Sequence, residues 1–351
     1  MKKILSLSLL FSLLLSLFSC SLGNRDDDGA RTKTVSTTYF HTVSLIYTFG
    51  DEDGTKIEKY AAISDECLSY YHKLFDIYFE YAGINNIKTI NKKAGKEAVT
   101  VDRELVDFLL YCKELFTLTN GKTNIMLGSV LEIWHDARED ATEDFGYLSP
   151  SRLPRAEELA DAATHTSIDS LIIDEEACTV YISDPDASID VGAIAKGYTV
   201  DMLTQRLVDE GADSVVLNIG GSLRTIGLKP DGTPWVTGIK DPSGDASDSL
   251  KCRIEIGDGA VVTSGDYERY FISGDKKYHH IIDPVTLMPA DYFSAVTILT
   301  KDSGLADALS TALFCMSYDE GLALIEGLSD VDAIWIFKDG RMESTDGVRI
   351  L

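Results

Sequence analysis

The strongest constraint on the fold is a succession of short apolar or alternating segments, separated by tight turns, that runs from Val35 to the end of the chain. Segments of this kind favour strands, and turns rich in glycine and aspartate favour hairpins between them. Strands are predicted at residues 35–49, 57–60, 170–182 (as a hairpin), 215–218, 260–271, 278–282, 295–299 and 331–337. Because many consecutive strands are joined by hairpins, we expect an α+β fold with mainly antiparallel sheet, and not a doubly wound parallel sheet.

Helices are predicted where apolar residues recur at helical spacing, over residues 65–81, 103–117, 155–164, 197–210 and 305–316. Asp102 stands where an N-cap residue is favoured for the second of these. Residues 140–154 are polar and rich in turn formers, which predicts a loop. No internal repeat and no dividing linker is visible, so we expect one large domain over residues 35–351, with helices flanking the sheet.

The first residues have the pattern of an export signal. Lys2 and Lys3 precede an apolar run, 4–18, that is too short to span a bilayer comfortably. The following Leu17-Phe18-Ser19-Cys20 resembles a lipobox. We therefore expect a signal peptide at 1–19, a lipidated Cys20 with a solvated tether at 20–34, and an extracytoplasmic protein anchored to the membrane. The alternative is an ordinary signal peptide followed by an incidental cysteine.

The charge of the chain excludes one large class of partners. Lys and Arg number 32 against 57 Asp and Glu, which gives a formal net charge of −25. Nucleic-acid affinity rests on clustered basic side chains, so a nucleic-acid-binding surface is not expected. A small phosphate ligand is compatible with this charge, because it needs only a few donors and a cation.

The cysteines after Cys20 do not form a recognisable metal or disulfide pattern. They contain no CxxC pair and are odd in number: Cys67, Cys112, Cys178, Cys252 and Cys315. Neither a structural zinc site nor a complete disulfide framework is expected. Cys112 and Cys315 lie among apolar residues at helical spacing, and we interpret both as small buried hydrophobic side chains.

Three segments combine small residues with polar ones in a way that suits a ligand. Residues 189–198 comprise a short strand, a small-residue loop and a helix start, where backbone amides and Lys196 suit an anion. Taken alone, this pattern fits a tight strand-to-helix turn equally well. Residues 217–222 lead into a glycine pair, and 262–267 place hydroxyls and a carboxylate beside a glycine. Each of these is weak by itself.

Two further positions suggest metal or proton chemistry. Asp307 and Thr311 are four residues apart on a predicted helix, so their oxygens share one face. A carboxylate and a hydroxyl suit Mg²⁺, which also takes waters and phosphate oxygens. The alternative is that Asp307 only complements the helix dipole. His279 and His280 precede an Asp-Pro turn, where a histidine serves as a metal ligand, a general base or, most simply, a surface residue.

The order of these segments is more specific than any one of them. The set 190–198, Asn218-Ile219-Gly220-Gly221, 263–267, 280–284 and Ala306-Asp307 with Thr311 resembles the FAD:protein FMN transferase family, the ApbE-like flavin transferases. Residues 119–124 also resemble the family segment that precedes this central region. The resemblance extends over roughly residues 39–316.

The resemblance implies an enzyme that splits FAD at its pyrophosphate and attaches FMN to a threonine of an exported or membrane flavoprotein, with AMP as the other product. It implies Mg²⁺ as cofactor and FAD as substrate. Two alternatives use the same residues. One is an Mg²⁺-dependent FAD pyrophosphatase that releases FMN and AMP, and the other is a surface lipoprotein that binds flavin without turning it over.

The resemblance also implies roles for individual residues. The metal would be held by the side chains of Asp307 and Thr311 and by the backbone carbonyl of Ala193. FAD contacts are expected from Lys122, Thr123, Asn124, Asp190 and Lys196, with Phe40 and Tyr78 lining the flavin site and Ile281 touching the nucleotide. His280 is the candidate base that deprotonates the acceptor threonine.

The chain departs from the family pattern at a few positions. Ser222 and Asn124 stand where the family commonly has asparagine and aspartate, and Leu287 stands where a glycine is usual. Phe40-His41-Thr42 replaces a common Met-Gly-Thr. These departures bear on the FAD contacts around residues 40, 124 and 222, and they leave the metal pair untouched.

Overall fold

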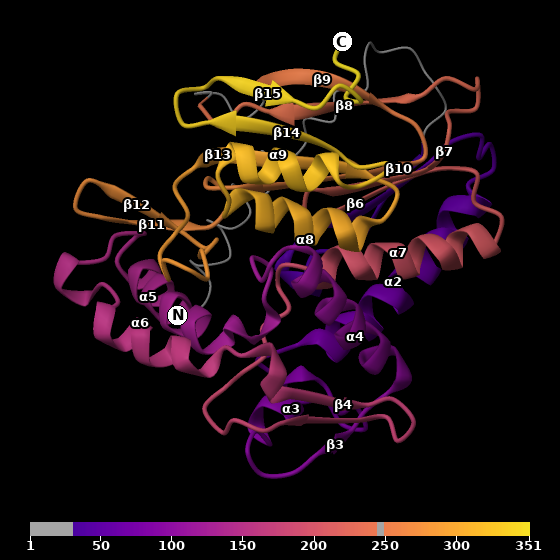
Figure 1. The fold of residues 1–351 in the computed structure, drawn as a ribbon. Coiled ribbons are helices and arrows are strands. Elements are labelled where there is room, and N and C mark those ends of the chain that lie inside the picture. The colour runs from indigo at the N-terminus through magenta and orange to yellow at the C-terminus, as the bar shows by residue number, and fades with distance from the viewer. Residues whose placement is uncertain (1–30, 244–248) are drawn as a thin grey trace, which may run out of the picture.

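A computed structural model describes residues 31–243 and 249–351 (Figure 1). The predicted signal peptide, Cys20 and the tether up to residue 30 lie outside the described residues. The last four tether residues do not remain a tether, because Arg31–Ser36 form the first strand, β1. Among the described helices, none combines the length and the hydropathy that a membrane span requires.

The core is an eight-stranded sheet whose neighbours are all antiparallel. In spatial order its strands are β1 (Arg31–Ser36), β2 (Ser44–Thr48), β6 (Ser214–Ile219), β7 (Ser222–Gly227), β10 (Gly259–Gly265), β13 (Phe293–Thr300), β14 (Asp332–Phe337) and β15 (Met342–Ser344). Three smaller units are β11 (Tyr270–Ser273) with β12 (Lys276–His279), β8 (Trp235–Lys240) with β9 (Leu250–Ile256), and β3 (Val99–Thr100), β5 (Thr179–Ile182) and β4 (Leu171–Asp174). The predicted α+β class with mainly antiparallel sheet is confirmed.

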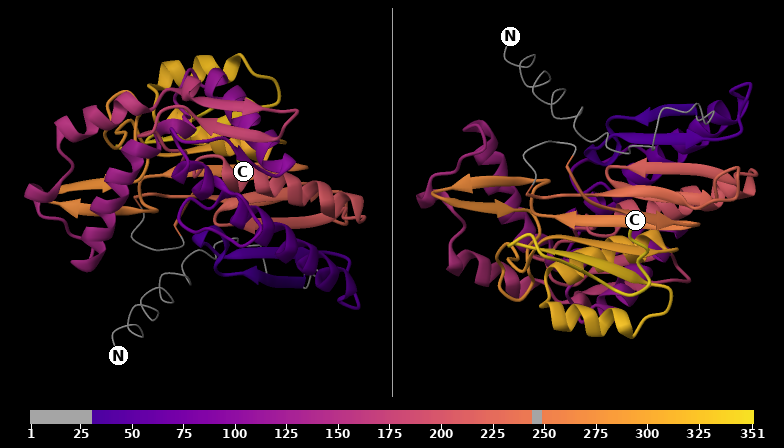
Figure 2. Two further views of the ribbon diagram at one scale, coloured as in Figure 1. Left: turned by 90° about the horizontal axis from the view of Figure 1, so that it is seen from below. Right: turned by 90° about the horizontal axis from the view of Figure 1, so that it is seen from above.

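Helices cover one face of the large sheet, and the β8–β9 hairpin covers the other (Figures 1 and 2). The helices are α2 (Thr55–Phe75), α3 (Ile87–Lys92), α4 (Arg103–Leu118), α5 (Gly128–Glu143), α6 (Ala156–Ala162), α7 (Ala195–Asp209), α8 (Ser303–Phe314) and α9 (Tyr318–Glu326). Short 3-10 turns are η2 (Tyr39–His41), η3 (Ile125–Leu127), η4 (Pro150–Arg152), η5 (Ala163–His165) and η6 (Ile168–Ser170). At one end of the molecule, α5 and α6 lie beside the β11–β12 hairpin (Figures 1 and 2).

The alternation of side chains along the strands explains this layering. On β10, Val261 packs toward the β8–β9 hairpin, whereas Val262 packs with α8 and α9. On β14, Ile334 and Trp335 divide between the same two sides. Because successive residues of a strand point to opposite faces, a strand covered on both sides is apolar almost throughout. The buried run in β14 is therefore the sequence signature of a central strand.

The predicted strand at 57–60 is wrong, because these residues lie in the first turns of α2. Asp51 holds this helix start: its carboxylate accepts hydrogen bonds from the backbone N–H groups of Lys56 (3.1 Å) and Ile57 (2.9 Å). Four residues are too few to separate a strand period from a helical one. The predicted helix at 65–81 is real, but it begins at Thr55 and ends at Phe75.

The single predicted strand at 35–49 is interrupted. β1 and β2 pair with each other, and between them η2 holds Phe40 and His41 at positive φ angles of 52° and 54°. This conformation is unusual for residues other than glycine and depends on surrounding contacts. The Phe40 N–H donates to Nδ1 of His72 on α2 at 3.4 Å. The break therefore places the rings of Phe40 and His41 against His72 of α2.

The predicted loop at 140–154 is wrong in its first part, because α5 continues through Glu143. Its apolar face packs Val130, Trp134 and Ala137 into the core, while its outer face is charged. The loop was predicted there because the last residues of this helix are mostly polar and face solvent, as loop residues do. The five cysteines of the described chain are all free, and Cys112 and Cys315 are fully buried, as predicted.

Candidate active site

A cavity of about 490 Å³ opens where the ends of the large sheet, α5, α7 and α8 meet. Every residue to which the sequence analysis assigned a role lines it: Phe40, Tyr78, Lys122, Thr123, Asn124, Asp190, Ala193, Lys196, His280, Ile281, Asp307 and Thr311. The Asn218–Ser222 turn joins β6 to β7 at its wall, with Gly220 and Gly221 at positive φ. Segments that are scattered along the chain thus converge on one space.

The carboxylate of Asp307, on α8, lies against the start of α7. Its Oδ2 accepts a hydrogen bond from the Gly197 N–H at 3.0 Å and lies 3.5 Å from Nζ of Lys196. Asp307 is 5% exposed, and burial raises its pKa, an effect that the charge of Lys196 partly offsets. A buried carboxylate gains from a further cation, because an opposite charge favours its ionised form.

The oxygens around Asp307 suit a hard cation. Thr311 follows one turn later on α8, and its hydroxyl lies 3.5 Å from the Ser264 hydroxyl, which also contacts Ser310 at 2.8 Å. Ala193 lies in the small-residue loop that leads into α7, and it lines the same cavity. A carboxylate, a hydroxyl and a backbone carbonyl are the ligand types that Mg²⁺ prefers. The residues present therefore fit the expected metal.

Close packing of α7 against α8 brings Lys196 to Asp307. A Cβ atom added at Gly197 would stand 2.1 Å from the Ser303 carbonyl oxygen and 2.8 Å from Cβ of Asp307. No side chain fits at this distance without displacing a helix. Gly197 is therefore what allows its own N–H to reach the carboxylate.

We expect Gly197→Ala to destabilise the protein by about 3 kcal/mol and to move α8 away from the α7 start, because overpacking a rigid contact forces backbone shifts. The matched control is Gly257→Ala, whose added Cβ would meet nothing closer than Leu228 Cδ2 at 3.9 Å. Urea unfolding of both variants measures the difference. Equal stabilities for the two variants would contradict the packing argument.

The loop 122–124 is tied to the core by its own polar groups. The Thr123 hydroxyl donates to the Ala308 carbonyl on α8 at 2.8 Å, and Lys122 pairs with the buried Asp283 at 3.0 Å. The Asn124 side chain accepts from the Met126 N–H (2.9 Å) and donates to the Thr166 carbonyl (2.9 Å). These three residues line the cavity, and these bonds hold the shape of its wall.

The two neighbouring histidines differ completely in their surroundings. His279 is buried in the core, where its Nε2 donates to the Ala290 carbonyl at 2.8 Å and its Nδ1 accepts from the Ile281 N–H at 3.3 Å. His280 faces the cavity, and its buried Nδ1 has no hydrogen-bond partner among the described residues. Burial, together with the charges of Arg269 and other nearby groups, lowers the pKa of His280 to about 3. His280 is thus a neutral imidazole with a free nitrogen at neutral pH.

Burial lowers the pKa of His279 to about 4, which links this residue to acid stability. The unfolded chain takes up a proton at His279 below about pH 6.5, and the folded chain does so only near pH 4. Stability is therefore lost as the pH falls between these values, by up to about 3 kcal/mol.

We expect His279→Gln to flatten the fall in unfolding free energy between pH 7 and pH 4, measured by urea titrations across this range. The control is His165→Gln. Asp184 raises the pKa of His165, so that histidine stabilises the fold at acid pH, and its removal changes the slope in the opposite direction. Identical pH slopes for wild type and His279→Gln would contradict the prediction.

Aromatic rings form one wall of the cavity. The Tyr78 ring, 44% exposed, lies 5.3 Å from the His135 ring and 6.3 Å from the His41 ring. Phe40 packs edge-on against His72 at 5.6 Å. A partly exposed tyrosine beside such rings offers a flat apolar surface on which a planar ligand stacks.

Several basic residues of the cavity were missed by the sequence analysis, and three of them affect the pKa of Asp190. These three are His135 and Arg138 on α5, and Arg269 at the start of the β11–β12 hairpin. Burial raises the pKa of Asp190, and the Gly192 N–H together with these three side chains offsets part of that effect. The His-x-x-Arg spacing would have indicated a shared helix face, but the helix itself was not predicted.

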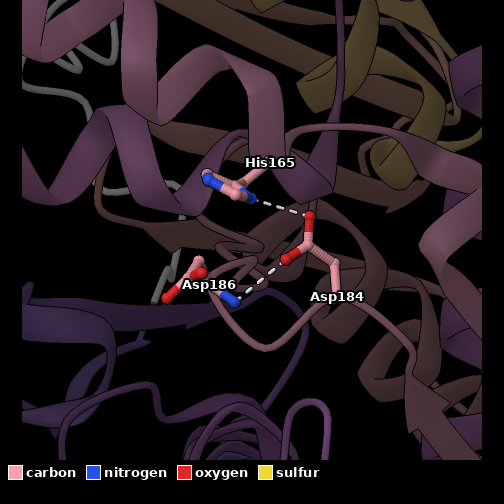
Figure 3. A group of neighbouring side chains, drawn as sticks. All are labelled: His165, Asp184 and Asp186. Carbon is pink, nitrogen blue, oxygen red and sulfur yellow. Dashed lines mark hydrogen bonds and ion pairs between the residues drawn. The ribbon is translucent and has the colours of Figure 1, made fainter.

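A second group of potential metal ligands lies outside the cavity lining. His165, Asp184 and Asp186 bring their ligand atoms within 4.8 Å of one another (Figure 3). In Figure 3, Nδ1 of His165 contacts Asp184 at 2.8 Å, and the Asp186 N–H donates to the other oxygen of Asp184 at 3.0 Å. His165 and Asp184 are partly exposed and pair with each other, and Asp186 is exposed. It therefore serves below as a control for the Asp307 site.

The chain was compared with known protein families, curated proteins and solved structures. A family model described as the ApbE family matches residues 37–335. An FAD:protein FMN transferase of Klebsiella pneumoniae (strain 342) is 31% identical over 256 residues, covering 73% of this chain and 76% of the relative. One of Treponema pallidum (strain Nichols) is 31% identical over 276 residues, covering 75% and 73%.

Solved structures show the same fold. The ApbE protein of Thermotoga maritima superposes with a TM-score of 0.77 at 29% identity, covering 90% of this chain and 97% of its own. The flavin transferase ApbE from Vibrio cholerae gives 0.73 at 27% identity, with the same coverage. The family match spans the cavity and all the segments that line it, and this chain belongs to the ApbE family.

Proposed function

We propose that this protein is an Mg²⁺-dependent FAD:protein FMN transferase that links FMN to a threonine hydroxyl of an acceptor flavoprotein and releases AMP. The observation that carries the proposal is the convergence of an oxygen-rich cation site (Asp307 and Thr311), a lysine and a neutral histidine in one cavity. The names of the relatives support the same activity. Bound Mg²⁺ would offset the charge of the pyrophosphate and orient it for attack.

The residues of the chain would divide the work as follows. Tyr78 and the neighbouring rings stack on the flavin, and Lys196 contributes positive charge beside the phosphates. His280 takes the proton of the acceptor hydroxyl at an imidazole nitrogen, because a neutral alcohol is a poor nucleophile. The hydroxyl oxygen then bonds to the phosphorus on the FMN side, the bridging P–O bond breaks, and AMP leaves with the bridging oxygen. The proton on His280 passes to AMP or to water.

The cellular setting of the proposal rests on the N-terminal sequence. The lipobox-like Leu17-Phe18-Ser19-Cys20 supports export and a lipid anchor at Cys20. The acceptor would then be an exported or membrane flavoprotein. Metabolic labelling with a fatty acid, compared between wild type and Cys20→Ser, tests the anchor.

The activity is tested by incubating the protein with FAD, Mg²⁺ and a candidate acceptor domain, with and without its target threonine. Flavin fluorescence that stays on the denatured acceptor, with one AMP released per FMN attached, is the expected result. AMP formed at the same rate without any acceptor would show a pyrophosphatase instead. FAD binding with neither AMP nor labelled acceptor would show a flavin-binding protein.

A further inference from the structure

The charge of the cavity differs sharply from that of the whole protein. Among the described lining residues, five lysine and arginine side chains stand against four carboxylates, in a chain with a net charge of −25. The basic ones are Lys122, Arg138, Lys196, Lys240 and Arg269. A concave site that gathers cations on an acidic protein attracts an anionic ligand.

Most of these cations already have a partner in the protein. Lys122 pairs with Asp283, and Lys196 lies beside Asp307. Lys240 sits over the ring of Tyr267, 4.7 Å from its centroid. In the part of the chain that the structure describes, neither Arg138 nor Arg269 forms an ion pair with a carboxylate. These two guanidinium groups are therefore the cavity cations that can still pair with a bound anion.

Among the described residues, Arg138 is held in place by a hydrogen bond to an imidazole and not by a direct ion pair. It is half-buried on α5 and donates from Nη2 to Nδ1 of His135 at 2.7 Å. A guanidinium only donates hydrogen bonds, so Nδ1 of His135 is the acceptor. Because this imidazole carries no negative charge, the bond does not cancel the positive charge of Arg138. Burial lowers the pKa of Arg138 and the charge of Arg269 lowers it further, while Tyr78, Glu139 and Asp190 offset part of this effect. Two like charges close together are unfavourable until an anion lies between them.

Arg269 approaches the same region from the opposite element. It is exposed at the cavity rim, and its carbonyl accepts from the His280 N–H at 3.1 Å at the base of the β11–β12 hairpin. Both arginines are close enough to His280 to disfavour its protonated form, as is Lys196. Both arginines thus line the same cavity as this imidazole.

We propose that Arg138 and Arg269 form an anion site that holds the FMN-side phosphoryl group of the substrate next to His280. This inference rests on the proposed function, in which the base and the attacking hydroxyl must meet at the phosphorus that is transferred. Guanidinium groups suit phosphate because their donors match its oxygens in pairs. Asp307 and Thr311 would then bind the pyrophosphate through the metal, and Arg138 and Arg269 would bind it directly.

Binding measurements without Mg²⁺ test the site independently of catalysis. The full-length protein is titrated with FMN and with riboflavin, which shares the flavin ring but has no phosphate, and flavin fluorescence is followed. We expect Arg138→Gln and Arg269→Gln each to weaken FMN binding by about tenfold or more, with riboflavin affinity unchanged. Lysine at either position should restore part of the loss. Arg152→Gln, which removes a surface arginine paired with Asp140, should change neither affinity.

The outcomes separate this proposal from the proposed function. Equal losses for FMN and riboflavin, or no loss for either, would overturn the anion site, even if the wild type transfers FMN normally. If the variants lose affinity for FMN only, and the wild type transfers no FMN to any acceptor, the anion site would be supported and the transferase contradicted. Circular dichroism of each variant confirms that a loss of FMN binding is not a loss of folding.

Discussion

Replacing Asp307 with asparagine should reduce FMN transfer by a factor of about 10²–10³ or more, because the variant keeps the shape of the side chain and loses the charge that holds the cation. Its amide oxygen still accepts from the Gly197 N–H, so we expect the fold to be kept. The measurement is the rate of flavin labelling of an acceptor domain over a range of Mg²⁺ concentrations. The half-saturating Mg²⁺ concentration should rise with the loss of rate.

The matched control is Asp184→Asn, which removes a carboxylate from the other group of potential ligands (Figure 3). That variant should keep both the rate and the Mg²⁺ dependence of the wild type. A fully active Asp307→Asn with unchanged Mg²⁺ dependence would show that the cation does not bind at α8. Loss of activity in Asp184→Asn alone would move the metal to His165 and its neighbours.

Replacing His280 with alanine should slow transfer by a factor of about 10²–10⁴ while FAD affinity stays near that of the wild type. The neutral imidazole adds no charge for the phosphates, and its proposed task is confined to the proton of the acceptor hydroxyl. Single-turnover labelling measures the rate, and fluorescence titration measures the affinity. Added imidazole should restore part of the rate, which a purely structural loss would not allow.

The pH profile gives a second test of His280. With a pKa of about 3, this base stays unprotonated in the free enzyme from pH 5 to pH 8. We therefore expect that kcat/KM of the wild type does not fall near pH 6.5 because of His280. If a fall does occur there, it should persist in His280→Ala. A fall that disappears in this variant would mean that His280 titrates as an exposed histidine and that the cavity does not bury it. His279→Gln is the neighbouring control, and it should alter acid stability with little effect on the rate.

Much of the fold could be predicted from local pattern. The glycine pair at 220–221 forms a two-residue turn between β6 and β7, as the sequence indicated, because only glycine adopts such angles freely. The helix with Asp307 and Thr311 on one face also follows from spacing alone. Two errors, at residues 57–60 and 140–143, arise where a few residues fit more than one period or where a solvent-facing helix is polar. Others concern bounds: the strands predicted at 35–49 and 260–271 are each interrupted, and the helix predicted at 65–81 ends at Phe75.

The candidate site was only partly accessible to sequence reasoning. The ordered segments identified the residues that line the cavity, including Phe40, whose backbone conformation depends on its contact with His72. Arg138 and Arg269 were missed, because they are separated by more than a hundred residues, α5 was not predicted and no recognised motif includes either of them. Both line one cavity because α5 lies beside the β11–β12 hairpin (Figure 2).

By itself, the sequence determined the α+β class and the placement of Asp307 and Thr311 on one helix face, because these depend on local periodicity and spacing, whereas the resemblance to a known family indicated the segments that line the cavity. The tertiary structure decided which histidine faces the cavity. His279 and His280 are adjacent and chemically identical, but His279 ends β12 with its side chain in the core, whereas His280 follows the strand and lines the cavity. Packing of Ala290 and Phe314 around His279 makes it a core residue, and this leaves His280 beside the arginines with a free nitrogen.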